Sequence, residues 1–283
     1  MSPQRAAPGQ RSRTQTLVVE LVTEELPPKA LKSLGTAFAD TLVAELRRRN
    51  VLTEASEATP YATPRRVAVS VTDVRSAAAD AEAIDRLMPA KVARDPSGAP
   101  SEALRKKLTS LGRGHLATAG LEIAEGEDRL YVASDGNAEY VYLRRLVQGM
   151  SLERALQESL DIAIARLPIQ KRMRYPAAGS YYNDVEFVRP AHRLLALHGG
   201  GVIPVTALGL AAGRTSAGHR FLARSDLSIE TAQAYAPTLE AEGKVLPSFA
   251  QRRAAIVGGL QAAASDATVI RPDTLLAAVP ALR

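Results

Sequence analysis

The spacing of hydrophobic residues predicts the first elements of the chain. The run from Thr16 to Thr23 is apolar and β-branched, which predicts a strand. Glu24, Glu25 and two prolines follow, and this combination favours the positive end of a helix that we expect to continue to about Asn50. Its apolar residues recur at spacings of three and four and form one stripe toward a core: Leu31, Leu34, Phe38, Leu42 and Leu46.

Two apolar segments, Glu57–Thr63 and Arg65–Val74, follow that helix. The second alternates valine with polar or small residues, a pattern that predicts a half-buried strand. One strand, a helix and two more strands would make a compact α+β unit. Residues 75–100 are rich in Ala, Asp, Gly and Pro, and we interpret them as a loop or an insertion.

The remaining pattern predicts alternating helices and strands. We expect helices at Ser101–Leu111, from Ser151 to about Leu167, at Thr231–Ala241, from Ser248 onward and from Pro272 to Arg283, and strands at Leu121–Ile123, Arg129–Ala133 and Tyr140–Leu146. Residues 168–183 read as a cationic loop. The expected organisation is a disordered tail (1–14), an N-terminal α+β unit (15–75), a central α+β domain (76–225) and a helical segment (226–283) that ends as part of a longer polypeptide.

Three consecutive glycines, from Gly199 to Gly201, join two apolar runs at Arg193–His198 and Val202–Leu210. Glycine permits the positive φ of a tight turn, so these runs predict a hairpin. Such a hairpin would bring its two ends together. Each end carries a similar polar group, and we expect the four side chains to lie near one another: Arg189, His192, His219 and Arg220.

Charge is concentrated around this hairpin. Residues 162–224 contain nine Lys or Arg but two acids, whereas the whole chain of 283 residues has a net charge of +6. The excess suits a polyanionic partner. Aromatic residues make up 4% of the chain, which argues against a dominant base-stacking surface. Absence of cysteine excludes disulfides and thiolate metal sites and agrees with a cytoplasmic location. No apolar run is long enough to span a membrane.

Few residue patterns suggest catalysis. A phosphate-binding glycine loop is absent, and His198 with the three glycines lacks a nucleophile elbow to make it an esterase motif. His192 and His198 have no cysteine or carboxylate cluster near them in the sequence, so we favour hydrogen-bonded or RNA-facing histidines over metal ligands. For Arg47–Arg49 we favour compensation of the helix macrodipole over RNA contact.

Arginine remains the most informative chemistry, because its planar donor fork matches phosphate. The candidate residues for RNA binding or for a subunit interface are Lys171, Arg172, Arg174, Arg189, His192, His219 and Arg220. We expect Arg172, Arg174, Arg189 and Arg220 to share one solvent-reachable surface. Catalytic and metal-binding residues are not expected in this chain.

Five segments together resemble the bacterial glycyl-tRNA synthetase beta subunit. They are Val-Glu-Leu-Val-Thr-Glu-Glu-Leu-Pro-Pro-Lys-Ala-Leu (19–31), Ala-Thr-Pro-Arg-Arg-Val-Ala (62–68), Leu-Pro-Ile-Gln-Lys-Arg-Met-Arg-Tyr (167–175), Phe-Val-Arg-Pro-Ala-His (187–192) and Gly-His-Arg-Phe-Leu (218–222). They fall in family order. The chain departs from the family in Tyr175, where a tryptophan is usual, in a small insertion at 134–140 and in a length less than half that of the family.

The resemblance implies an aminoacyl-tRNA synthetase, a ligase that attaches glycine to tRNA(Gly) with ATP. It implies an assembly of two alpha and two beta chains in the cytoplasm. The alpha subunit would hold the catalytic core with ATP and Mg, and this chain would hold no cofactor but support tRNA binding and assembly. It further implies an α+β fold with mixed or antiparallel sheets and packed helices, whose middle part is similar to the editing-type domain of phenylalanyl-tRNA synthetase. The alternatives are a stand-alone RNA-binding module and a module that only docks a protein partner.

Overall fold

The computed structural model describes residues 13–118, 121, 123–125, 128–177, 184–264, 276 and 279. It confirms the predicted α+β class. The chain forms two compact units: unit 1 comprises residues 1–78 and 150–283, and unit 2 comprises residues 79–149. Apart from residues 276 and 279, the expected helix at Pro272–Arg283 lies outside the described residues, as does most of the expected tail at 1–14.

Unit 1 is built on a mixed sheet with the strand order β12-β13-β10-β1-β3-β2, and β11 pairs with the end of β10. Its strands are β1 (Thr14–Thr23), β2 (Ala58–Thr63), β3 (Arg66–Arg75), β10 (Ala191–His198), β11 (Gly201–Val202), β12 (Thr206–Ala207) and β13 (Leu210–Gly213). Two short pairs lie outside it: β8 (Met173–Pro176) with β9 (Asp184–Phe187), and β14 (Thr215–Ser216) with β15 (Leu227–Ser228). The helices are η1 (Pro28–Ala30), α1 (Leu31–Arg48), α4 (Leu152–Ala165), α5 (Tyr235–Ala241) and α6 (Phe249–Ala263).

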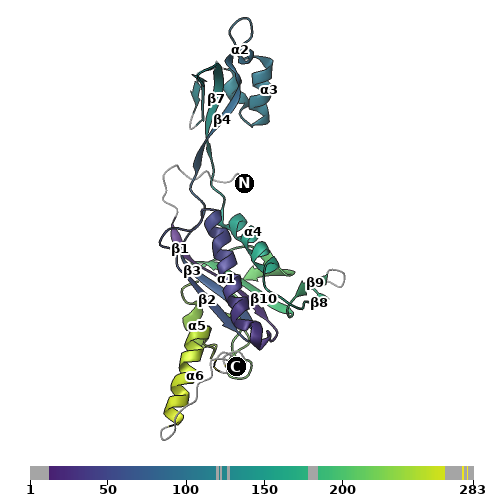
Figure 1. The fold of residues 1–283 in the computed structure, drawn as a ribbon, viewed down its shortest axis with the longest axis vertical. Helices are drawn as coiled ribbons and strands as arrows, with labels where there is room; N and C mark the ends of the chain where they lie inside the picture. Colours follow the sequence, from purple (N-terminus) through teal and green to yellow (C-terminus); the bar gives the residue numbers. More distant parts are fainter. Residues whose placement is uncertain are drawn as a thin grey trace. The chain divides into compact units, whose positions relative to one another are not determined.

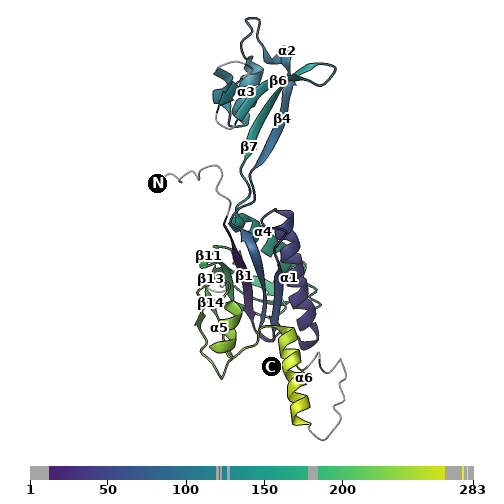
Figure 2. The same ribbon diagram turned by 90° about the vertical axis from the view of Figure 1, so that its left-hand side faces the viewer.

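Helices cover both faces of the sheet in unit 1 (Figures 1 and 2). On one face the predicted stripe of α1 packs with α4 against strand residues such as Val19, Val69 and Ala196. On the other face α5 covers a smaller core that includes Val18, Ala68 and Tyr235. The prediction that β3 is half-buried is therefore wrong for its first half, because Arg66 to Val69 are buried on both faces.

A buried charge network lies on the α5 face. The Tyr235 hydroxyl donates to Glu20 Oε1 at 2.7 Å, and Arg66 Nη1 lies 3.3 Å from the same oxygen. Burial raises the pKa of Tyr235 well above its ordinary value, and the negative charge of Glu20 raises it further. Arg66 also donates to the carbonyl of Ala217. The network thereby ties α5 and the segment before residue 218 to the centre of the sheet.

The prediction of one long hairpin from Arg193–His198 and Val202–Leu210 is correct at the turn but wrong for most of the second strand. Gly199 has φ +56°, and His198 pairs with Gly201 as expected. The second strand ends at Val202, because Pro204 lacks an N–H for a ladder. A turn with positive φ at Leu208 and Gly209 then sends β13 back parallel to β10.

Unit 2 is a four-stranded antiparallel sheet with the order β4-β7-β6-β5. Its elements are β4 (Ala81–Pro89), α2 (Ala90–Ala93), α3 (Glu102–Ser110), η2 (Gly114–Thr118), β5 (Ile123–Glu125), β6 (Asp128–Ser134) and β7 (Glu139–Val147). Helices α2 and α3 lie on one face (Figure 1), where Leu104, Leu108, Leu130 and Leu143 form a separate core.

Unit 2 corrects the interpretation of residues 75–100 as a loop or insertion. The strand β4 occupies the middle of that segment and pairs with β7, about sixty residues away. The composition of this segment did not predict β4, because a strand with one face in solvent needs few apolar residues. Residues 168–183 were likewise interpreted as a loop, but β8 forms a strand there; residues 178–183 are outside the described ones.

The compact units also follow boundaries different from the expected division at residues 75 and 225. Residues 150–225 belong to unit 1, because β10 pairs with β1 and α4 packs with α1. The two ends of unit 2 leave unit 1 side by side, since Ala77 bridges to Ser151 and Ala78 N donates to Met150 O at 2.9 Å.

Candidate RNA or subunit interface

Glu24 and Glu25, directly after β1, form the centre of a cationic cluster that we call the Glu24–Glu25 site. Glu24 accepts from His192 Nε2 at 2.9 Å and from Arg65 Nη2 at 3.3 Å. Glu25 lies 3.7 Å from Arg65 Nε and 3.9 Å from Arg220 Nη1. Both glutamates precede the first turn, as expected. Their side chains contact Arg65, His192 and Arg220 from three other segments of the chain. Their favourable effect on the positive end of the helix stays a prediction.

Arg189 joins this site to the β8–β9 hairpin. Its Nε donates to the Glu25 carbonyl at 3.0 Å, and its Nη1 lies 3.3 Å from Met173 Sδ. The neighbouring Tyr175 hydroxyl accepts from the backbone N–H of Ala191 at 3.1 Å, and burial raises the pKa of that hydroxyl. The hairpin is thus fastened beside the start of β10.

The Gly218–Leu222 segment reaches the site through Arg220. His219 Nδ1 accepts from the backbone N–H groups of Phe221 and Leu222, so this side chain shapes its own loop. Phe221 and Leu222 are 84% and 68% exposed. The four hairpin-end side chains therefore include three at the Glu24–Glu25 site, and His219 stands in the adjoining loop.

All five sequence motifs that carry the family resemblance meet here. Each contributes at least one residue: Glu24, Arg65, Met173, Arg189 and Arg220 come from the first to the fifth motif in order. The sequence did not predict Arg65, Glu24 or Glu25 as residues of this site. All three lie within the family motifs, and those motifs, spread over about two hundred positions, come together at one place.

Lys171, Arg172 and Arg174 are exposed beside Met173. Arg174 pairs with Asp184 across the β8–β9 hairpin at 2.8 Å. Within the described part of the chain, Lys171, Arg172, Arg189 and Arg224 have no carboxylate oxygen within 4 Å. Among the described residues, no carboxylate neutralises these four positive charges by direct pairing.

The local charge count overestimated the number of unpaired cations. Arg166 reaches Glu45, Arg193 pairs with Asp226, Arg214 lies 3.8 Å from Glu230, and Arg220 is near Glu25. These carboxylates lie outside residues 162–224. The two acids within that span were therefore a poor guide to neutralisation, because tertiary packing brings in others.

The charges also set the ionisation of Glu24. Desolvation raises its pKa, but the hydrogen bond with His192 and the charge of Arg65 outweigh that effect and lower the pKa below its ordinary value. Glu24 is therefore held as a carboxylate that orients His192. A carboxylate held in this way is a positioning group rather than an acid.

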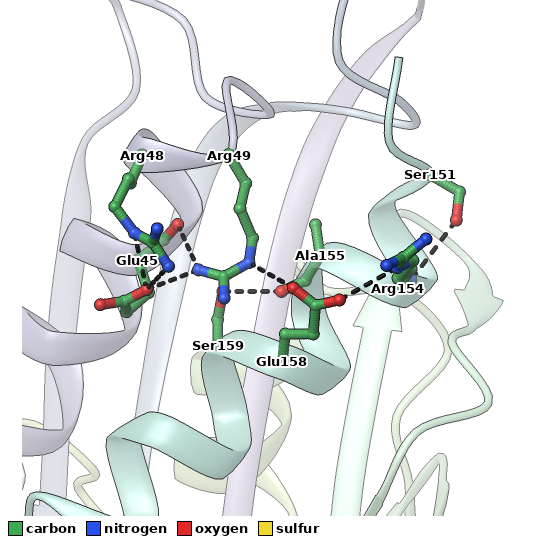
Figure 3. A network of polar contacts seen from close by, with 8 residues as sticks. All are labelled: Glu45, Arg48, Arg49, Ser151, Arg154, Ala155, Glu158 and Ser159. Carbon is green, nitrogen blue, oxygen red and sulfur yellow. Dashed lines mark hydrogen bonds and ion pairs between the residues drawn. The ribbon is translucent and has the colours of Figure 1, made fainter. Parts of the chain in front are cut away.

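Arg48 and Arg49, in the triplet at the end of α1, form ion pairs. Arg49 is 7% exposed and bridges Glu45 of α1 and Glu158 of α4 (Figure 3). Arg48 also pairs with Glu45, but it is 65% exposed. This arrangement joins two helices, and it leaves Arg47 as the exposed member without a carboxylate within 4 Å among the described residues.

Donor groups for a metal do not gather in the described part of the structure, where no three His, Asp or Glu side chains are placed to hold an ion. His198 Nε2 is 2.8 Å from the Val74 carbonyl, a structural hydrogen bond. No helix among the described residues is long and apolar enough to cross a membrane. The fold and the site together define an α+β protein that displays arginines and a histidine around two glutamates.

Comparisons with known proteins identify the family. The model of the glycyl-tRNA synthetase beta subunit family matches residues 17–283. The chain is 47% identical over 252 residues to the "Glycine--tRNA ligase beta subunit" of Acidovorax sp. (strain JS42), covering 88% of this chain and 34% of that protein. It is 43% identical over 267 residues to the protein of the same name from Ralstonia nicotianae, covering 94% of this chain and 37% of that one. The chain belongs to the glycyl-tRNA synthetase beta subunit family, and it spans about a third of the length of these relatives.

Proposed function

We propose that this chain is the N-terminal part of a glycine–tRNA ligase beta subunit and supports the ATP-dependent attachment of glycine to tRNA(Gly). The observation that carries the proposal is the convergence of all five family motifs on the Glu24–Glu25 site. A set of distant residues that share one surface patch is typical of a binding site.

The site would bind phosphate rather than perform chemistry. Lys171, Arg172 and Arg189 supply donors that no carboxylate pairs with in the described part of the chain, and arginine holds phosphate through two parallel hydrogen bonds. ATP and Mg would be held by an alpha subunit, in a cytoplasmic assembly of two alpha and two beta chains. The similarity of the central segment to an editing-type domain of phenylalanyl-tRNA synthetase stays a prediction.

Charge reversal in the reconstituted alpha–beta complex tests the proposal. The variant Arg172→Glu/Arg189→Glu should lower tRNA affinity and kcat/KM for tRNA by roughly tenfold or more, because two phosphate contacts become repulsive. Arg105→Glu/Lys107→Glu makes the same change in net charge on α3 of unit 2 and should have little effect. Unchanged glycylation and unchanged tRNA affinity in the double variant would contradict the proposal.

Protein docking is the second candidate function, and the exposure of Phe221 and Leu222 favours it. Apolar side chains beside Arg220 suit a subunit interface, whose core is apolar and is enriched in aromatic residues and arginine. Under this alternative, Phe221→Ser/Leu222→Ser would prevent co-purification with the alpha chain while RNA binding by the free chain stayed unchanged. Loss of RNA binding with intact assembly would favour the first function.

A further inference from the structure

The sheet of unit 2 has one face covered by helices and one face without a covering element among the described residues. Leu130, Val141 and Leu143 point to the helices α2 and α3. The alternating neighbours on β6 and β7 point to the opposite face, which we call the open face. Its side chains include Glu82, Ile84, Arg86, Arg129, Tyr131, Ala133, Tyr140, Tyr142, Arg144 and Leu146.

Three of the eight tyrosines in the chain gather on the open face. Tyr131 and Tyr142 are directly opposite each other on β6 and β7, and their rings stack with centroids 5.6 Å apart and an interplanar angle of 20°. Tyr140 lies one row further along the sheet. All three are half-buried, so each ring keeps part of its surface in solvent.

Arginines lie among these rings. The guanidinium carbon of Arg86 is 4.2 Å from the centroid of Tyr140, and that of Arg129 is 5.8 Å from the centroid of Tyr131. Arg86 and Arg144 pair with Asp135 and Glu82. Within the described residues Arg129 has no carboxylate oxygen within 4 Å, which leaves one positive charge beside the stacked pair.

From this juxtaposition we infer that the open face of unit 2 binds single-stranded RNA, with unpaired bases stacked on Tyr131, Tyr140 and Tyr142 and the backbone held by Arg129. Aromatic side chains on an exposed four-stranded sheet are a general means of binding unpaired bases, because every base offers a flat π-face. Arginine adds cation–π contact and phosphate hydrogen bonds. The low aromatic content of the chain pointed away from such a surface, because composition does not show that the tyrosines are clustered.

A protein partner fits this face less well. Ile84 is the one large aliphatic side chain of the set that is more than half exposed, at 59%. The core of a stable protein interface buries more apolar surface than one aliphatic residue provides. Tyrosines interleaved with arginines match the alternation of base and phosphate along a nucleic-acid strand. This inference does not depend on the Glu24–Glu25 site, which is in unit 1.

The test is binding of a labelled oligouridine of about ten nucleotides to the 283-residue chain, followed by fluorescence anisotropy. The variant Tyr131→Leu/Tyr142→Leu keeps strand-compatible apolar residues but removes the rings, and it should weaken binding by roughly tenfold or more. Tyr131→Phe/Tyr142→Phe keeps the rings and should bind within about twofold of the wild type, because stacking does not need the hydroxyl. Circular dichroism checks that each variant is folded.

Two controls make the outcome decisive. Arg129→Ala should weaken binding and make its salt dependence shallower by about 0.7 in log–log slope, whereas Arg105→Ala on the helical side should do neither. The affinity for a blunt-ended RNA duplex should differ little between the wild type and Tyr131→Leu/Tyr142→Leu. The inference is overturned if the folded Leu variant binds oligouridine like the wild type, or if duplex and single strand lose affinity equally. Glycylation by the alpha–beta complex with Arg172→Glu/Arg189→Glu measures the proposed function, and oligouridine binding by Tyr131→Leu/Tyr142→Leu measures this inference. Failure here and failure of the proposed function are therefore distinguishable.

Discussion

Unit 1 joins its charged residues to partners from distant parts of the sequence, whereas unit 2 keeps several of its charged residues on a sheet face beside aromatic rings. In unit 1, Arg66 reaches Glu20 and Arg49 reaches Glu158. In unit 2, Arg129 lies over Tyr131, and Arg86 lies over Tyr140 while it also pairs with Asp135. The difference teaches that arginine content alone does not locate a binding surface. The partner of each guanidinium decides whether it stabilises the fold or stays available to a ligand.

Removal of Arg66 should have the largest effect on stability. Arg66→Ala leaves Glu20, which is 0% exposed, as a buried carboxylate without its cation, and we expect a loss of about 3–5 kcal/mol in the free energy of unfolding. Denaturant unfolding measures it. The neighbouring Arg65→Ala is the matched control and should cost under about 1 kcal/mol, since its pairs are partly exposed. If the two variants lost the same free energy of unfolding, burial would not explain how much each arginine contributes to stability.

The bridge between α1 and α4 should come next. Arg49→Ala removes charged hydrogen bonds from a nearly buried side chain and should destabilise unit 1 by about 2 kcal/mol. Arg48→Ala, on the same carboxylate but mostly exposed, should cost less than about 0.5 kcal/mol. Thermal and denaturant unfolding of both variants compare them. A larger effect at Arg48 would contradict the role assigned to burial.

Excision of unit 2 should leave unit 1 nearly unchanged. Replacement of residues 79–149 by a Gly-Gly turn joins ends that the structure already holds together through Ala78 and Met150. We expect the free energy of unfolding of unit 1 to change by about 1 kcal/mol or less, because both cores of unit 1 remain and the closed loop becomes shorter. A failure of the excised chain to fold would show that the units are interdependent.

Acid should have the smallest effect. The pKa of Glu24 is lowered in the folded protein, so its contribution to stability is complete above the unfolded pKa and is lost as pH falls through the folded pKa. Between about pH 5 and about pH 3, the wild type should lose slightly more stability than Glu24→Gln, by less than about 1 kcal/mol because the site is partly exposed. Glu54→Gln, at an exposed position outside the site, serves as the control in the same titration. If the wild type and Glu24→Gln lose the same free energy of unfolding as pH falls, the interactions of the Glu24 carboxylate with His192 and Arg65 do not stabilise the fold.

Local patterns were sufficient for most elements of both units. The stripe of α1, the serine caps of α3, α4 and α6 and the turn at Gly199 all follow from residues within one or two turns of one another. The strand β4 was missed because its partner β7 is distant and its open face is polar. The candidate cations were found as a group, but their common centre at Glu24 and Glu25 was not.

The sequence by itself determined the family, the α+β class and the positions of most helices and strands, because each depends on residue order and short-range spacing. Only the tertiary structure decided which carboxylate neutralises which arginine, that residues of five separate motifs meet at one site, and that Tyr131, Tyr140 and Tyr142 share a face. Those properties arise when sheet pairing brings together residues that are far apart along the chain. Composition and local spacing do not predict such contacts, because strand register and topology are set by the packing of the whole unit.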